Sequence, residues 1–155
     1  MELAAAAEAA KAPDDGPAPP PEPAPDPEDH IAVYAEDDPS NCKLVERVMA
    51  ERGGVRLVTT GTGEEVQGLV RRHRPELVLL DLHLPDLDGE AVLRRLLADP
   101  DTAEVPVVVV SADADPGQVQ RALAAGAREY LTKPLDVARF RAVVDELLAG
   151  VASRP

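Results

Sequence analysis

The feature that most constrains the fold of this chain is a regular alternation between short apolar runs and segments with helical periodicity, which begins at residue 31. Two of the runs, at 76–80 (ELVLL) and 105–110 (VPVVVV), are apolar over nearly their whole length. Such runs are typical of strands in a parallel sheet that helices cover on both faces.

Five strand–helix units fit between residues 31 and 150, and a series of this kind predicts an α/β fold. Because crossovers are right-handed, we expect a flavodoxin-like, doubly wound domain with a five-stranded parallel sheet of order 2-1-3-4-5 and helices on both faces. The expected strands are 31–35, 55–60, 76–80, 105–110 and 129–132. The helical residues expected to face inward are Leu44, Val45, Val48, Met49, Val66, Leu69, Val70, Val92, Leu93, Leu96, Leu97, Val119, Leu123, Phe140, Val143, Val144, Leu147 and Leu148.

The first part of the chain, residues 1–29, has a different composition from the rest. It holds eight of the sixteen prolines, and eight acidic residues against one lysine. Such a segment buries too little apolar surface to offset the entropy of ordering it, so we expect a disordered tail or linker. The predicted domain then covers 30–151, and 152–155 form a short C-terminal tail.

The charge and the cysteine content indicate which partners this protein can bind and in which compartment it lies. The net charge is −13, and residues 31–155 are acidic too, with 21 acids against 15 bases. We therefore expect no direct binding to nucleic acid. No apolar run is long enough to cross a membrane, and a single cysteine, Cys42, fits a reducing compartment, so we expect a cytoplasmic protein.

Polar residues follow the predicted strands at the point where each one ends. Glu36 and Asp37 follow the first strand, Asp81 the third, Ser111 the fourth and Lys133 the fifth. In an open α/β sheet, ligands bind at these carboxyl ends. Because the first and third strands are expected to be neighbours, three carboxylates would meet there and repel one another unless a cation lay among them. Oxygen ligands of this kind suit Mg²⁺.

Four sequence blocks, AEDDPSN, LLDLHLPDLDGE, VVVVSADA and EYLTKPL, resemble the signature blocks of the response-regulator receiver family of two-component signalling. They occur in the order and spacing of that family, and the resemblance covers roughly residues 31–150. It implies a bacterial signalling switch that takes a phosphoryl group from a histidine kinase or a histidine phosphotransfer protein. The chain resembles either a stand-alone receiver or the receiver part of a hybrid histidine kinase.

The resemblance also implies a role for each residue of the site. Asp81 would be the phosphoacceptor, with Lys133 pairing with a phosphoryl oxygen and Ser111 hydrogen-bonding the phosphoryl group. Tyr130 would then move between exposed and buried positions on the face formed by the fourth helix, the fifth strand and the fifth helix. The peptide bond between Lys133 and Pro134 is expected to be cis, as is usual in the family.

For the metal site, the resemblance implies Mg²⁺, with Mn²⁺ as a substitute. Its ligands would be Glu36, Asp37, Asp81 and the backbone carbonyl of His83. His83 and Asp113 lie two residues beyond Asp81 and Ser111, at positions where the family varies. We expect these two side chains to tune the lifetime of the phosphorylated state.

Simpler explanations exist for several of these residues. Asp38 or Ser40 is expected to cap the first helix, and Asp86 and Asp88 are expected to be turn and cap residues rather than ligands. Tyr130 has a second explanation as a residue that only packs at the edge of the sheet.

Other functions on the same fold remain as alternatives. The chief one is a pseudo-receiver, an interaction module that works without phosphorylation. A flavodoxin-like binder fits poorly because the loop after the first strand, EDDPS, would repel a phosphate group. A haloacid dehalogenase phosphatase would carry a second acid where this chain has His83. We expect a switch that catalyses its own phosphorylation and dephosphorylation rather than a turnover enzyme. The downstream target and the oligomeric state are left open.

Overall fold

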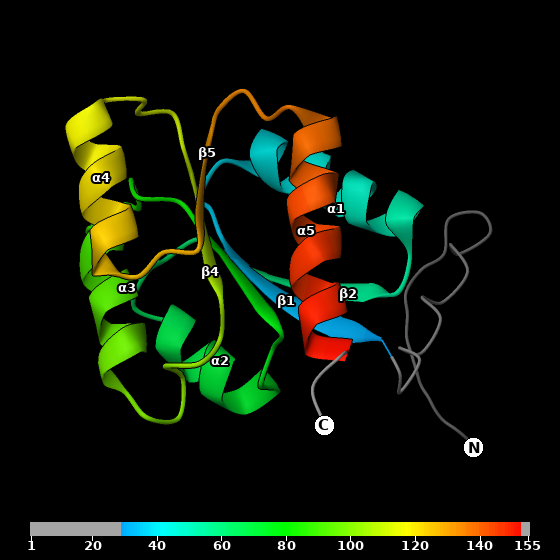
Figure 1. The fold of residues 1–155 in the computed structure, drawn as a ribbon, viewed down its shortest axis with the longest axis horizontal. Helices are drawn as coiled ribbons and strands as arrows, with labels where there is room; N and C mark the ends of the chain where they lie inside the picture. Colours follow the sequence, from blue (N-terminus) through cyan, green and yellow to red (C-terminus); the bar gives the residue numbers. More distant parts are fainter. Residues whose placement is uncertain (1–28, 153–155) are drawn as a thin grey trace, which may run out of the picture.

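The computed structural model describes residues 29–152 (Figure 1). The predicted disordered tail and the predicted C-terminal tail lie outside these residues, apart from Asp29 and Ala152 at the two limits. Strands and helices alternate along the whole described part. The strands are β1 (His30–Ala35), β2 (Val55–Thr60), β3 (Leu77–Leu80), β4 (Val107–Ser111) and β5 (Glu129–Thr132). The helices are α1 (Pro39–Arg52), α2 (Val66–His73), α3 (Gly89–Ala98), α4 (Pro116–Ala125) and α5 (Val137–Ala152).

The strands form one parallel sheet in the order β2-β1-β3-β4-β5, which confirms the predicted topology. The described part of the chain enters the sheet at β1, near its middle, runs outward to β2, and then crosses β1 to continue through β3 to β5. The reversal of strand order falls between β1 and β3, so the loops that follow these two strands diverge there. A cleft at this place is where open α/β sheets bind ligands.

Each face of the sheet supports its own apolar core. Helices α1 and α5 cover one face, and α2, α3 and α4 cover the other (Figure 1). All four residues of β3 are completely buried, as expected for a central strand covered on both faces. On the α5 side, Phe140 and Leu148 are among the largest buried side chains and pack with Tyr34 of β1. The two layers of helices, one on each face of the sheet, thus hold the ends of the strands in place.

The starts of three helices are capped as their sequences indicate. Asp38 accepts a hydrogen bond from the Ser40 amide at 2.8 Å, Asp88 accepts one from Glu90 at 3.0 Å, and Asp115 accepts one from Gln118 at 3.1 Å. The capping roles predicted for Asp38 and Asp88 are therefore confirmed. The end of α4 is capped by Gly126, which adopts a left-handed conformation with φ 119°.

Some predicted details differ from the structure. Strand β4 begins at Val107 instead of residue 105, because Pro106 has no amide hydrogen for the ladder and only its carbonyl pairs, with the Val78 amide. Leu123 was expected to face inward but is 42% exposed. Helix α4 covers β5, which is the edge strand, and buries Ala122 instead.

Candidate functional site

The register of the sheet places two acidic residues side by side. Ala35 of β1 is paired with Leu80 of β3, so the residues that follow, Glu36 and Asp81, leave the sheet at the same level. The Asp81 amide donates to the Ala35 carbonyl at 3.0 Å, and the Glu36 amide donates to the Thr60 carbonyl at 2.9 Å. The backbone of both acids is thus still held by the strand ladder.

Three carboxylates meet at this point, as the sequence predicts. Each of Glu36, Asp37 and Asp81 offers an oxygen, and these oxygens all lie within 4.8 Å of one another. Glu36 and Asp81 are only 3% and 4% exposed, whereas Asp37 is exposed to solvent. A cluster of hard oxygen donors that is open to water on one side fits Mg²⁺, which keeps several of its own waters when it binds.

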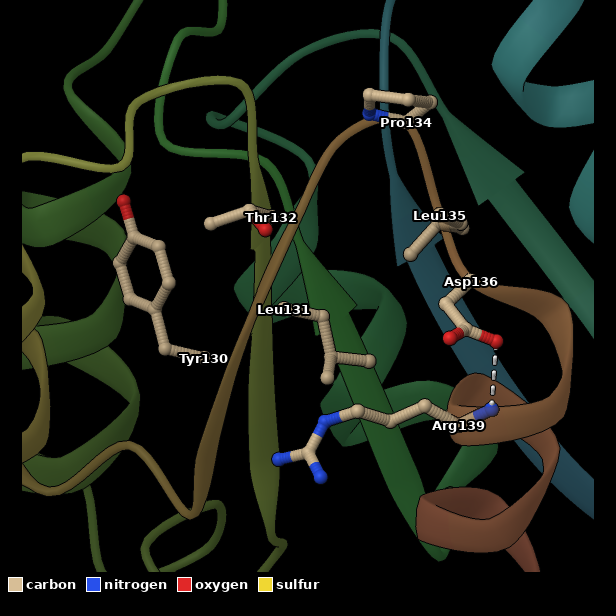
Figure 2. Close-up of a pocket in the computed structure, with 7 residues that line it drawn as sticks. All are labelled: Tyr130, Leu131, Thr132, Pro134, Leu135, Asp136 and Arg139. Carbon is tan, nitrogen blue, oxygen red and sulfur yellow. Dashed lines mark hydrogen bonds between the residues drawn. The ribbon is translucent and has the colours of Figure 1, made fainter.

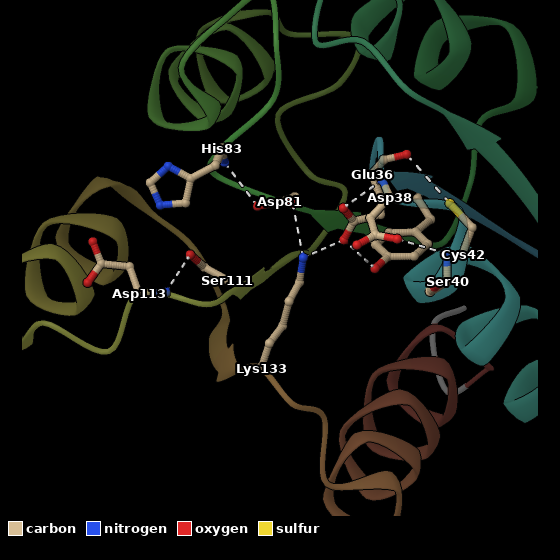
Figure 3. Close-up of polar contacts among 10 residues, drawn as sticks. Glu36, Asp38, Ser40, Cys42, Asp81, His83, Ser111, Asp113 and Lys133 are labelled. Carbon is tan, nitrogen blue, oxygen red and sulfur yellow. Dashed lines mark hydrogen bonds and ion pairs between the residues drawn. The ribbon is translucent and has the colours of Figure 1, made fainter.

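Lys133 provides the positive charge at this cluster. Its Nζ atom lies 2.5 Å from Glu36 Oε1 and 3.0 Å from Asp81 Oδ2, and its side chain is 15% exposed (Figure 3). Burial acts to lower the pKa of Lys133, but the hydrogen bonds to Glu36 and Asp81 outweigh it and raise that pKa above its usual range. Burial raises the pKa of Glu36, and the contact with Lys133 opposes this shift. Lys133 is therefore a protonated donor that two buried acids share.

The remaining oxygens of the two buried acids are held by backbone amides. Asp81 Oδ1 accepts a hydrogen bond from the His83 amide at 2.9 Å, and Glu36 Oε2 accepts one from the Asp38 amide at 3.2 Å. Each carboxylate is thus oriented from two sides before any ligand arrives. The His83 side chain itself is exposed, beside the mouth of the site (Figure 3).

The site contains one polar residue that the sequence reasoning missed. Tyr34 is completely buried in β1, and its hydroxyl donates to Glu36 Oε1 at 3.0 Å. Burial raises the pKa of this phenol, so it stays protonated and remains a donor. The signal was available, because residues two apart in a strand lie on the same face and Tyr34 is two residues before Glu36.

The loop from β3 to α3 carries Asp81 and His83 and is closely packed. The Gly89 amide donates to the Leu82 carbonyl at 2.9 Å. A Cβ atom at Gly89 would lie 2.4 Å from Leu82 Cα and 2.6 Å from the Asp81 carbonyl oxygen. Only glycine allows the start of α3 to approach the backbone of the predicted phosphoacceptor this closely.

Asp86 lies in the bend after β3, as predicted for a turn residue, and it has a further role. Its two carboxylate oxygens accept hydrogen bonds from the amides of Gly63 at 2.8 Å and Glu64 at 3.0 Å. These hydrogen bonds lower the pKa of Asp86 below its usual value, that from Gly63 most strongly. Asp86 thus ties the loop after β3 to the loop after β2. The contact is nonlocal, so the local sequence gave no sign of it.

A second chain of contacts runs from Ser111 towards the surface. Ser111 is fully buried at the end of β4, and its Oγ accepts a hydrogen bond from the Asp113 amide at 3.1 Å. The carbonyl of Asp113 in turn accepts a hydrogen bond from the Tyr130 hydroxyl at 2.6 Å. The half-buried ring of Tyr130 lies on the α4 side of β5 (Figure 2). Tyr130 is therefore bonded to the loop that follows Ser111 and does more than pack at the sheet edge.

The predicted site residues thus fall into two connected groups. Glu36, Asp37, Asp81 and Lys133 form one cluster, and the backbone of His83 is bonded to it. Ser111, Asp113 and Tyr130 form the other, and the backbone amide of Lys133 donates to the Ser111 carbonyl at 2.8 Å. The peptide bond between Lys133 and Pro134 is cis, as predicted.

Comparisons with known proteins agree with this arrangement. A sequence profile of the response regulator receiver domain matches residues 32–145. The chain is 36% identical over 108 residues to the polar-differentiation response regulator DivK of Brucella anthropi, covering 70% of this chain and 87% of DivK.

Solved structures of similar fold point the same way. One is the receiver domain of sensor histidine kinase PA1611 from Pseudomonas aeruginosa, with a magnesium ion in its active-site cleft. It matches with a TM-score of 0.71 and 26% identity, over 78% of this chain and 98% of that one. Another is the signal receiver domain of a signal transduction histidine kinase from Syntrophus aciditrophicus. It matches with a TM-score of 0.73 and 28% identity, over 81% of this chain and 95% of that one. Within residues 29–152, no helix has the length and apolar character needed to cross a membrane.

Proposed function

Because this chain belongs to the response regulator receiver family of two-component signalling, we propose that Asp81 is its phosphoacceptor and that phosphorylation requires Mg²⁺. The observation that carries the proposal is the position of Asp81, which is buried beside two further acids with one oxygen on the Lys133 ammonium. The phosphodonor would be a phosphohistidine on a histidine kinase or a phosphotransfer protein. The proposed location is the cytoplasm, where such donors act.

In the proposed reaction, a carboxylate oxygen of Asp81 attacks the phosphorus atom of the phosphohistidine. An O–P bond forms as the N–P bond breaks, and the imidazole leaves with the bonding electron pair and takes up a proton. Hydrolysis of the resulting acyl phosphate by water restores the Asp81 carboxylate. The protein would thus catalyse its own phosphorylation and dephosphorylation, without turning over an external substrate.

The neighbouring residues would prepare the site for the negative charge that arrives. Glu36, Asp37, Asp81 and the carbonyl of His83 would hold Mg²⁺, or Mn²⁺ as a substitute, which would supply positive charge against the repulsion between these acids and the phosphoryl group. A magnesium ion in the cleft of the PA1611 receiver supports this assignment. The mobile ammonium of Lys133, already 3.0 Å from Asp81, would pair with a phosphoryl oxygen.

Ser111 would couple the phosphorylation site to the surface of the domain. To donate its hydroxyl hydrogen to the phosphoryl group, Ser111 would swing inward. Its Oγ would then move away from the Asp113 amide, from which it now accepts a hydrogen bond, and the loop carrying Asp113 would move. Since the carbonyl of Asp113 holds the Tyr130 hydroxyl, this movement would change the position of Tyr130. The face formed by α4, β5 and α5, where Leu123 is 42% and Val137 40% exposed, would then bind a downstream protein.

This function can be tested with beryllofluoride, which mimics a phosphoryl group on a carboxylate. NMR spectra of the ¹⁵N-labelled full chain would be recorded with Mg²⁺, before and after beryllofluoride is added. We expect amide shifts at Asp81 and also at Tyr130 and along α4, and no such shifts in Asp81→Asn. Shifts that persist in Asp81→Asn, or a parent protein that does not respond, would contradict the proposal.

A further inference from the structure

The hydrogen bonds around Glu36 divide its two carboxylate oxygens into different environments. Oε1 accepts from the Tyr34 hydroxyl at 3.0 Å and from Lys133 Nζ at 2.5 Å. Oε2 accepts from the Asp38 amide alone among the hydrogen bonds found within residues 29–152, at 3.2 Å. A carboxylate oxygen has room for about two partners, so Oε1 is saturated and Oε2 keeps a free lone pair.

We propose that Tyr34 is a positioning residue of the cation site: its buried hydroxyl fixes Glu36 Oε1 on the core side, so that Oε2 is presented to Mg²⁺. This inference rests on the proposed function, because it takes Glu36 to be a cation ligand. Tyr34 itself touches neither the cation nor the phosphoryl group and acts only through Glu36. The occupant of the site is a divalent cation with a preference for oxygen ligands.

The sheet makes Tyr34 well suited to this role. Tyr34 lies in β1, and Glu36 directly follows that strand with its amide still bonded to the Thr60 carbonyl at 2.9 Å. The extended backbone therefore directs both side chains towards the face covered by α1 and α5. The Tyr34 ring is completely buried there and packs in the same cluster as Phe140. A phenol fixed in this way can hold a carboxylate at little further loss of conformational entropy, because its ring is already ordered.

The proposed chemistry gives the hydroxyl a second use. Lys133 is shared between Glu36 Oε1 and Asp81 Oδ2, and pairing with a phosphoryl group would draw its ammonium towards Asp81. Glu36 is only 3% exposed, so water cannot readily replace the lost donor on Oε1. Tyr34 would then be the donor that remains, and Glu36 would keep its orientation while Lys133 moves.

The test compares Mg²⁺ binding by the parent protein and by Tyr34→Phe, measured by isothermal titration calorimetry. Phenylalanine keeps the ring in the core and removes only the hydroxyl. We expect the Kd for Mg²⁺ to rise about tenfold, the order of effect seen when a partner of a metal ligand is removed. Circular dichroism and the Tm without Mg²⁺ identify any variant that has lost its fold.

A double-mutant cycle with Glu36→Asp separates positioning from packing. Aspartate keeps the charge but withdraws the carboxylate from the Tyr34 hydroxyl by one methylene. We therefore expect Tyr34→Phe to change the Kd for Mg²⁺ by less than about twofold in the Glu36→Asp background. An equal tenfold loss in both backgrounds would mean that Tyr34 acts through packing and would overturn the inference.

The remaining outcomes separate the inference from the function on which it rests. If the parent binds Mg²⁺ and is phosphorylated on Asp81 but Tyr34→Phe binds Mg²⁺ as tightly, the positioning role is wrong and the proposed function stands. If the parent binds no Mg²⁺ at millimolar concentration, both are overturned.

Discussion

The Lys133 ammonium bridges two buried carboxylates that follow different strands, lying 2.5 Å from Glu36 Oε1 and 3.0 Å from Asp81 Oδ2. Charged groups this deeply buried are tolerated only when they are paired and hydrogen-bonded. The pairing also means that a divalent cation at the three acids would have Lys133 as a neighbour of like charge. The Lys133 ammonium would therefore weaken cation binding, and the same charge would pair with a phosphoryl group.

Replacing Lys133 by methionine should strengthen Mg²⁺ binding and slow phosphorylation. Without the ammonium, repulsion of a divalent cation falls, so Mg²⁺ should bind at least several-fold more tightly at pH 8. Phosphorylation by acetyl phosphate should slow by at least about tenfold, because a charged contact to the phosphoryl group is lost. Isothermal titration calorimetry measures the Kd for Mg²⁺, and the intact mass followed over time measures the rate of phosphorylation.

Lys133→Arg is the matched control for this pair of measurements, because it keeps the positive charge while changing the shape of the donor. It should retain a Kd for Mg²⁺ near that of the parent. Weaker or unchanged Mg²⁺ binding in Lys133→Met would contradict the view that Lys133 competes with the cation.

Removing the Ser111 hydroxyl should uncouple the phosphorylation site from Tyr130. The Ser111 Oγ holds the Asp113 amide, and the Asp113 carbonyl holds the Tyr130 hydroxyl, so Ser111 is the first link of the path. In Ser111→Ala, beryllofluoride should still shift the Asp81 amide, while the shift at Tyr130 falls to less than about half. Ser111→Thr, which keeps a hydroxyl, should restore the Tyr130 shift. If the shift at Tyr130 in Ser111→Ala is as large as in the parent, coupling through Ser111 and Asp113 is excluded.

His83 and Asp113 should differ in their effect on the lifetime of the phosphorylated protein. The His83 side chain is exposed beside Asp81 (Figure 3). The Asp113 carboxylate, in contrast, is already bonded to the Asp115 amide at 2.9 Å. His83→Ala should therefore change the rate of dephosphorylation more than Asp113→Ala does. The rates are read from the decay of the phosphorylated mass after the donor is removed. Two variants that both decay at the parent rate would show that neither residue controls access of water.

Two glycine substitutions should have opposite effects on stability. A Cβ at Gly89 would meet the backbone of Leu82 and Asp81, so Gly89→Ala should lower the free energy of unfolding by about 1–3 kcal/mol. Gly68 lies inside α2 with nothing within 4 Å of a Cβ, so Gly68→Ala should raise it by about 0.5–1 kcal/mol. Urea unfolding followed by circular dichroism measures both. A Gly89→Ala protein as stable as the parent would show that the loop after β3 can move away from α3.

The sequence was sufficient for the fold because its signals were local and consistent. Apolar runs such as that of β4, and capping residues such as Asp38 and Asp88, each indicate one kind of element. The same alternation placed Glu36 and Asp81 at neighbouring strand ends. Leu123 was misplaced because periodicity shows which residues are apolar, while the edge position of α4 decides how many of them are covered.

Two contacts of the site were missed, one between distant segments and one between neighbouring residues of the chain. Asp86 binds amides that lie more than twenty positions earlier in the chain, and no spacing rule connects the two loops. Tyr34 looked like an ordinary core residue because its ring fills the core and only its hydroxyl reaches Glu36. The contacts of Asp86 could therefore not be identified from the sequence, whereas the two-residue spacing of Tyr34 and Glu36 was a usable signal.

The phosphoacceptor role of Asp81 is tested most directly by the intact mass of the full chain after incubation with acetyl phosphate, with and without Mg²⁺, for the parent and for Asp81→Asn. We expect the parent to gain the mass of one phosphoryl group only when Mg²⁺ is present, and Asp81→Asn to gain none. A gain that is independent of Mg²⁺, or one that survives in Asp81→Asn, would contradict this role. If the parent gains no mass under either condition, that result too would contradict it and would favour an interaction module that works without phosphorylation.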